Sequence, residues 1–231
     1  MLITFNRRFL SQNPRAVFTA FRVEDFTNEV KNEKKYNELK ELALQVLADK
    51  ELIDEFKTTL VSKLYKSNSF LDILAKGASA FETSDVLQNV INMLTVLNGY
   101  TLSLVPTSDK FGRLDIDFLD GEFVYSNNGV KVAPVYKQNI EKSNAQAKNI
   151  LFLESVDETD YENYLQSITW TTLWLAKIFG VAPTRKILTI VADTVDVYST
   201  SEIDWTTEGW DQFGEISLIR KSRNATPKCH I

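Results

Sequence analysis

The sequence is poor in residues that cross-link or interrupt a chain. It has one cysteine, Cys229, and only eight glycines and five prolines among 231 residues. A single cysteine excludes an intramolecular disulfide, and with it the cystine-rich class of small secreted scaffolds. This favours a reducing compartment, which is the cytoplasm or, for a viral protein, the virion. With no repeat and no low-complexity run, the chain is expected to be continuously folded and not divided by a flexible tether.

A long apolar run and an excess of positive charge are also absent. The most apolar run, residues 168–182, is interrupted by Lys177 and is shorter than the roughly 20 residues that cross a bilayer, so we expect no membrane span. The formal net charge is -5. Phosphate binding depends on clustered lysine and arginine, so we expect no nucleic-acid partner. The basic residues near the C-terminus, among them Arg220 and Arg223, indicate a solvated end or a contact to an acidic neighbour.

What is present is enough apolar material for a packed core, at 44% hydrophobic and 11% aromatic residues. Apolar residues at helical spacing predict about four helices within residues 28–98, and strand-like segments precede and follow that region. A long helix at 157–179, apolar almost all round, is expected to be buried on most sides and to stop at Gly180. The predicted class is α+β, as a single domain over residues 1–231 with a possible helical subregion at 28–98, and strands from both ends of the chain share a sheet.

The ends of two of these helices are predicted from single residues. Gly77 is expected to close the third helix of the region, and Gly99 the fourth, because glycine accepts the left-handed conformation of a helix C-terminus. Thr83 or Ser84 is expected to cap the start of the fourth helix with its side-chain oxygen.

Four strand-like segments follow within residues 100–136 and predict an antiparallel meander. Asn128-Gly129 is the strongest hairpin signal, because a type I′ turn needs positive φ at both central residues. Asp120-Gly121 is expected to make a second tight turn. The segment that comes after the meander is compatible with a helix, a loop or a buried strand, and the sequence leaves it open.

The meander contains the part of the chain that most resembles a chemical site. Four carboxylates fall within eight positions: Asp115, Asp117, Asp120 and Glu122. On a strand, successive side chains alternate between faces, so Leu114, Ile116 and Phe118 point to one side and the carboxylates of the strand to the other. We therefore interpret the acidic residues as the solvent-facing side of a sheet, and we predict neither a metal site nor a cofactor.

The alternative interpretation is a divalent metal site. Asp115 and Asp117 would hold the ion of a hydrolase or transferase, with Asp193 and Asp196 as further ligands. A calcium-binding loop is excluded by spacing, because its fifth position, where a ligand is needed, is Leu119.

Residues for other catalytic chemistry are scarce. The only histidine, His230, and the only cysteine, Cys229, are adjacent near the C-terminus, where a catalytic base lacks the support that holds it in geometry. The chain has no GxSxG, HExxH, CxxC, Walker or GxGxxG motif. We predict no catalytic residue.

Aromatic residues in a polar region near the C-terminus indicate a binding surface. Trp205 and Trp210 lie among acidic residues, and aromatic side chains that a polar loop cannot cover are typical of interface cores. We predict a partner interface formed by Trp205, Trp210, Phe213, Arg220 and Arg223.

The sequence therefore predicts a non-enzymatic structural or assembly subunit of a large multi-chain particle, most concretely a virion or phage tail, neck or capsid accessory protein. Its partners would be protein chains, either further copies of itself or different subunits. Two alternatives stay open: the metal-dependent enzyme that uses Asp115 and Asp117, and a small regulatory protein that binds one partner.

Overall fold

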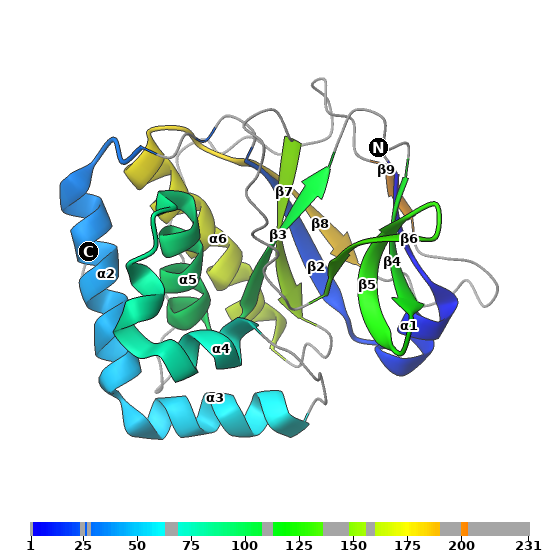
Figure 1. Cartoon of the computed structure of the whole chain (residues 1–231), viewed down its shortest axis with the longest axis horizontal. Coiled ribbons are helices and arrows are strands. Elements are labelled where there is room, and N and C mark those ends of the chain that lie inside the picture. The colour runs from blue at the N-terminus through cyan, green and yellow to red at the C-terminus, as the bar shows by residue number, and fades with distance from the viewer. Residues whose placement is uncertain are drawn as a thin grey trace.

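The computed structural model describes residues 2–23, 26, 29–62, 69–107, 113–135, 148–155, 160–189 and 200–202. These residues form three layers: helices on one side, a four-stranded sheet in the middle and a five-stranded sheet on the other side (Figure 1). We call the middle sheet the inner sheet and the other the outer sheet. The predicted α+β class is confirmed.

The first part of the chain holds two short strands and most of the helices. In chain order they are β1 (Leu2–Phe5), α1 (Arg7–Gln12), β2 (Val17–Arg22), α2 (Glu33–Ala48), α3 (Lys50–Ser62), α4 (Ser69–Lys76), the 3₁₀ helix η1 (Gly77–Phe81) and α5 (Val86–Asn98). The second part holds most of the strands and one long helix. These are β3 (Thr101–Thr107), β4 (Arg113–Leu119), β5 (Glu122–Asn127), β6 (Val130–Pro134), β7 (Lys148–Ser155), α6 (Tyr161–Phe179), β8 (Thr184–Thr189) and β9 (Thr200–Glu202).

The predicted helical region is confirmed, because α2, α3, α4 and α5 all lie within residues 28–98. Both predicted helix ends are confirmed as well. Gly77 follows α4 with φ +58°, and Gly99 follows α5 with φ +71°. At Gly99 the absence of a side chain also makes room for α3, since a Cβ there would lie 2.8 Å from the Phe56 ring.

The predicted cap of α5 is wrong by one or two positions. The capping residue is Asp85, whose carboxylate accepts a hydrogen bond from the Gln88 amide at 3.0 Å, and not Thr83 or Ser84. Thr83 has another role, because its hydroxyl donates to Asn89 Oδ1 at 2.7 Å. A carboxylate is also the better acceptor at the positive end of the helix dipole.

The inner sheet has the order β3-β7-β2-β8, and all its described pairs are antiparallel. The segment that the sequence left open forms β7, which pairs with β3 on one side and β2 on the other. Leu151 and Leu153 of β7 pack with the helices, whereas Ile150 and Phe152 pack toward the outer sheet. Because both faces of β7 are covered, its apolar run is continuous and carries no alternation.

The outer sheet has the order β6-β5-β4-β1-β9 and is mixed, since β1 runs parallel to β4. The predicted meander is correct for β4, β5 and β6 and wrong for β3, which pairs with β7 in the inner sheet. The physical reason is burial: β3 is buried on both faces, which only the middle layer allows. Both predicted tight turns are confirmed, with φ +50° at Asp120 and Asn128 and +86° and +76° at Gly121 and Gly129.

Strands from the two ends of the chain pair with each other, as the sequence predicted. β1 pairs with β9 in the outer sheet, and β2 pairs with β8 in the inner sheet. The sequence predicted one shared sheet, whereas the structure has two. Strand pairing therefore holds both ends of the described region in place.

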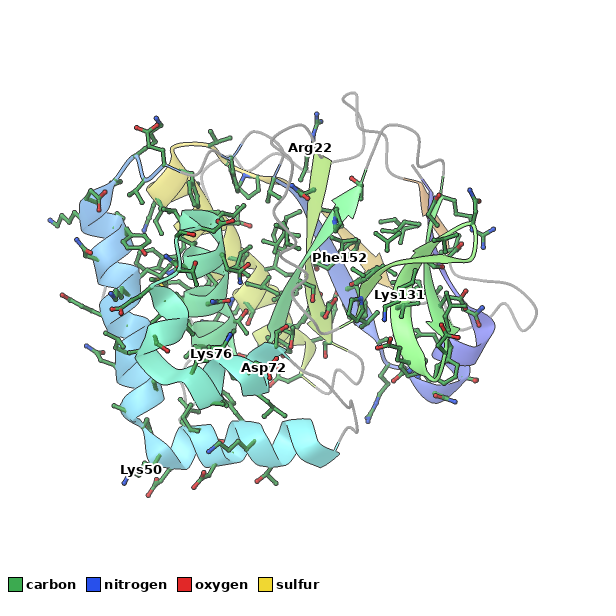
Figure 2. All side chains as sticks on the ribbon, in the orientation of Figure 1. Arg22, Lys50, Asp72, Lys76, Lys131 and Phe152 are labelled. Carbon is green, nitrogen blue, oxygen red and sulfur yellow. The ribbon has the colours of Figure 1, made fainter. Side chains whose placement is uncertain are left out.

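The buried residues form two clusters on either side of the inner sheet. One lies between the helices and the inner sheet and includes Phe21, Leu94, Leu153 and Ile168. The other lies between the two sheets, where the Tyr125 and Phe152 rings stack with centroids 4.8 Å apart. Figure 2 shows Phe152 between the two sheets. The clusters contribute most of the hydrophobic stabilisation of the layers.

The prediction of a long buried helix is confirmed by α6, although α6 begins after the cap Asp160, a few residues later than predicted. It ends at Gly180 as expected, and all of its residues except Tyr161, Glu162 and Leu165 are buried or half-buried. Tyr161 and Leu165 are 45% and 37% exposed. In the part of the chain that the structure describes, neither α6 nor any other helix has the length and apolar character needed to span a membrane.

Candidate functional site

The acidic residues singled out in the sequence lie on the outer sheet. Asp115 and Asp117 are on β4, Asp120 is in the turn that follows, and Glu122 begins β5. Leu114 and Ile116 are buried in the cluster between the sheets, so the carboxylates of β4 point to the opposite face. We call this the distal face of the outer sheet; the alternation that the sequence predicted is confirmed.

Asp115 is largely enclosed, with a side chain 13% exposed. The pairing registers place it between Thr4 of β1 and Ser126 of β5. Thr4 Oγ1 and Arg113 Nε both donate hydrogen bonds to Asp115 Oδ1. The guanidinium neutralises the carboxylate and the threonine ties it to the neighbouring strand, so Asp115 joins β1 to β4.

The other three carboxylates have local contacts or face solvent. Asp117 Oδ1 accepts a hydrogen bond from the Phe118 amide at 2.7 Å. Glu122 forms an ion pair with Lys131 across the β5–β6 hairpin, with side chains 43% and 42% exposed, and Figure 2 labels Lys131 on β6. Asp120 is exposed in its turn. The four acidic groups therefore spread along a strand and a hairpin.

The centre of the distal face is not open to solvent, and here the prediction of a solvent-facing surface needs correction. Thr4 is 2% exposed, and Val124 and Ser126 are 0% exposed. Among the described residues, Ser126 Oγ has no hydrogen-bond partner and Val124 belongs to neither hydrophobic cluster. The predicted exposure holds for Asp120 and partly for Glu122, whereas the region around Asp115 is enclosed.

Metal binding needs several ligands around one point. Within the described ranges, no group of three or more histidine, cysteine, aspartate or glutamate residues is arranged to hold an ion. Asp193 and Asp196, which the metal hypothesis adds, lie outside those ranges, as do His230 and Cys229. The predicted interface of Trp205, Trp210, Phe213, Arg220 and Arg223 also lies outside the described residues.

A second polar group, which sequence reasoning missed, lies between the two sheets. Glu154 at the end of β7 is 1% exposed, and the Tyr125 hydroxyl donates to its Oε1 at 2.5 Å. Ser103 on the neighbouring β3 is 0% exposed, and its Oγ has no hydrogen-bond partner among the residues that the structure describes. The sequence signal is a carboxylate two and four positions after the buried Phe152 and Ile150, and so on the same face of a strand, but it can be recognised only once β7 is known to be a strand. The Tyr125–Glu154 bond links the outer sheet to the inner one.

A third polar group fixes η1 to α5. Asn89 and Asn92 are 4% and 5% exposed. Asn92 Nδ2 donates to the Ala80 carbonyl at 2.6 Å, and Asn89 Nδ2 donates to the Thr83 carbonyl at 3.0 Å. Buried amides that bond to backbone carbonyls in a turn are a means of holding that turn. Like the other two groups, this one has an evident structural role.

Comparison with known proteins gives no relative. No protein-family model, no curated protein and no solved structure matches the chain.

Proposed function

We propose that this protein is a non-enzymatic structural or assembly subunit of a multi-chain particle. The most concrete version is a virion or phage tail, neck or capsid accessory protein, in the cytoplasm or the virion. The partners are protein chains, either other copies of this chain or different subunits. The interface predicted from the sequence, Trp205, Trp210, Phe213, Arg220 and Arg223, belongs to this proposal.

The observation that supports this proposal is that acidic residues of the outer sheet bond to other residues of the same chain. Asp115 bonds to Thr4 and Arg113, and Glu122 pairs with Lys131. The bond from Thr4 joins β1 to β4, and the Glu122–Lys131 pair joins the two strands of one hairpin, so these acidic groups strengthen the sheet. A surface whose charges are paired within one subunit suits a building block, because it remains compatible with close approach of a neighbour.

The experiment is purification of the untagged protein from its native source, with identification of the chains that accompany it. We expect a complex with other protein chains that persists through two separation steps. Recovery of the protein as a lone monomer would contradict the proposal.

The metal-dependent alternative is tested separately by thermal melting of the full chain during titration with magnesium, calcium or manganese. A ligand that binds the folded state raises the melting temperature, by an amount that grows with the ratio of ligand to Kd. We expect the midpoint to stay where it is. A saturable rise that Asp115→Asn abolishes would favour the enzyme hypothesis over the assembly role.

A further inference from the structure

The sequence contains two Asn-Gly pairs, Asn98-Gly99 and Asn128-Gly129. In such a pair the backbone nitrogen of the glycine can approach the preceding carboxamide closely, because glycine has no Cβ to hinder it. The structure gives the two pairs different surroundings. Asn98-Gly99 lies at the end of α5, whereas Asn128-Gly129 forms the turn between β5 and β6 at one edge of the outer sheet (Figure 1).

Both reactive groups of the Asn98-Gly99 pair are held by hydrogen bonds. The Asn98 carboxamide donates to Thr171 Oγ1 of α6 at 3.0 Å. The Gly99 amide donates to the Thr95 carbonyl at 3.1 Å, as the closing bond of α5. Gly99 also packs closely against α3, since a Cβ at this position would lie 2.8 Å from the Phe56 ring. A reaction between carboxamide and amide would therefore require the end of α5 to open.

The Asn128-Gly129 pair is exposed and has much weaker restraints. The Asn128 carboxamide donates to Asn127 Oδ1 at 3.4 Å, which is long for a hydrogen bond. The register pairs Asn127 with Val130, so the last bonds of the hairpin ladder belong to these two residues and not to the turn. No atom of the described residues lies within 4 Å of a Cβ built on Gly129. Because β6 is the end strand of its sheet, local opening of this turn costs little.

We propose that Asn128 is a site of spontaneous deamidation in the folded protein and that the hydrogen bonds of the α5 end protect Asn98 from the same reaction. The Gly129 amide nitrogen forms a bond to the side-chain carbonyl carbon of Asn128. The bond from that carbon to the carboxamide nitrogen breaks, and ammonia leaves with the proton that the Gly129 nitrogen loses. Water then opens the cyclic imide at either of its carbonyls, which gives aspartate or isoaspartate.

The two products differ in their effect on the hairpin. Aspartate tolerates positive φ as asparagine does, so it keeps the turn and adds a negative charge. Isoaspartate carries the main chain through its former side-chain carbon, which lengthens the backbone inside a two-residue turn whose twist must match the flanking strands. The isoaspartate product should therefore weaken the pairing of β5 with β6.

The test is peptide mapping by mass spectrometry on the full chain after incubation in weakly alkaline buffer at physiological temperature. We expect the peptide that contains Asn128 to gain the mass of deamidation, with isoaspartate among the products. The reaction there should be at least about ten-fold faster than in the peptide that contains Asn98, which reacts only when the helix end opens. Asn128→Gln should remove the mass increase, which assigns the reaction to Asn128 and not to Asn127. Melting curves verify that this variant is folded.

The unfolded chain in urea is the matched control, because the two Asn-Gly pairs are chemically identical and only the folded structure distinguishes them. In urea the rates at Asn98 and Asn128 should become similar, mainly through a rise at Asn98. An unmodified Asn128 in the folded chain, or equal rates at the two positions there, would overturn the inference. A difference that persists in urea would also overturn it, because the protection of Asn98 would then not come from the fold.

Discussion

Asp115 lies on a strand, but its surroundings differ from those of a strand face in water. Its carboxylate accepts two hydrogen bonds, one from a guanidinium, in a site where the side chain is 13% exposed. Hydrogen bonds to a charged partner are stronger than neutral ones, and they gain strength where water is excluded. The residue therefore stabilises the fold whatever else the sheet does.

We predict that Asp115→Asn lowers the free energy of unfolding by about 1 to 2 kcal/mol, because the charge-assisted bonds from Arg113 and Thr4 are weakened. Asp120→Asn is the control, since it makes the same chemical change at an exposed turn position and asparagine tolerates positive φ equally well. It should change stability by less than about 0.5 kcal/mol. Urea denaturation measures both. Equal effects at the two positions would show that Asp115 has no special role.

For two buried serine hydroxyls we predict the opposite effect, namely that their removal does not lower stability. Ser103 Oγ and Ser126 Oγ are enclosed and have no hydrogen-bond partner within the described ranges, so we expect each to carry an unbalanced desolvation penalty. Ser103→Ala and Ser126→Ala should leave stability unchanged or raise it by up to about 1 kcal/mol. Thermal or urea unfolding of the two variants is sufficient. A loss of more than about 1 kcal/mol would show that the hydroxyl is bonded in solution.

At the level of secondary-structure elements, Tyr164 connects helix α6 to the inner sheet. Its hydroxyl donates to the Leu153 carbonyl at 2.9 Å and lies 3.0 Å from Thr19 Oγ1. A phenol has one proton, and a carbonyl cannot donate, so Thr19 is the donor in the second bond. One hydroxyl therefore joins α6 to both central strands, β7 and β2.

Tyr164→Phe is expected to cost about 1 to 3 kcal/mol, because it leaves the buried Thr19 hydroxyl without its acceptor and removes the bond to β7. Tyr161→Phe removes the same atom one turn earlier, where the side chain is 45% exposed, and should be nearly neutral. Chemical denaturation of both variants gives the comparison. If the two losses were similar, the bonds to the inner sheet would have no net value.

The contact between α3 and the end of α5 depends on Gly99. A Cβ at this position would lie 2.8 Å from Phe56 Cε1, and the backbone has φ +71°. Gly99→Ala therefore combines left-handed strain with a steric clash, and we expect a loss of about 2 to 3 kcal/mol. Gly129→Ala has the same sign of φ and no atom within 4 Å of the new Cβ, so it should cost only about 1 kcal/mol. If Gly99→Ala and Gly129→Ala lowered the free energy of unfolding by the same amount, the predicted clash with Phe56 would be contradicted.

Helices and turns could be predicted from the sequence where the pattern that specifies them lies within a few neighbouring residues. The helices of residues 28–98 and the tight turns at Asn128-Gly129 and Asp120-Gly121 follow from periodicity and from residues that accept positive φ. Pairing partners were not predictable. The place of β3 in the inner sheet depends on β7, about fifty residues later in the chain.

At the scale of the whole molecule, the sequence identified the acidic strand but not the contacts that its carboxylates make in the folded chain. Alternation correctly separated Asp115 and Asp117 from the core, yet it carries no information on whether that face is covered. The enclosure of Asp115 and the buried pair Tyr125–Glu154 arise from strands that meet only in the folded chain. The proposed assembly role is supported by how these charges are paired within the chain.

The most direct measurement of that role is the sedimentation of the native protein in an unfractionated extract of its source. Every form of the assembly proposal predicts that the chain sediments faster than a 26.4 kDa monomer, in fractions that also contain its partner chains. A single boundary at the position of the lone chain would contradict the proposal.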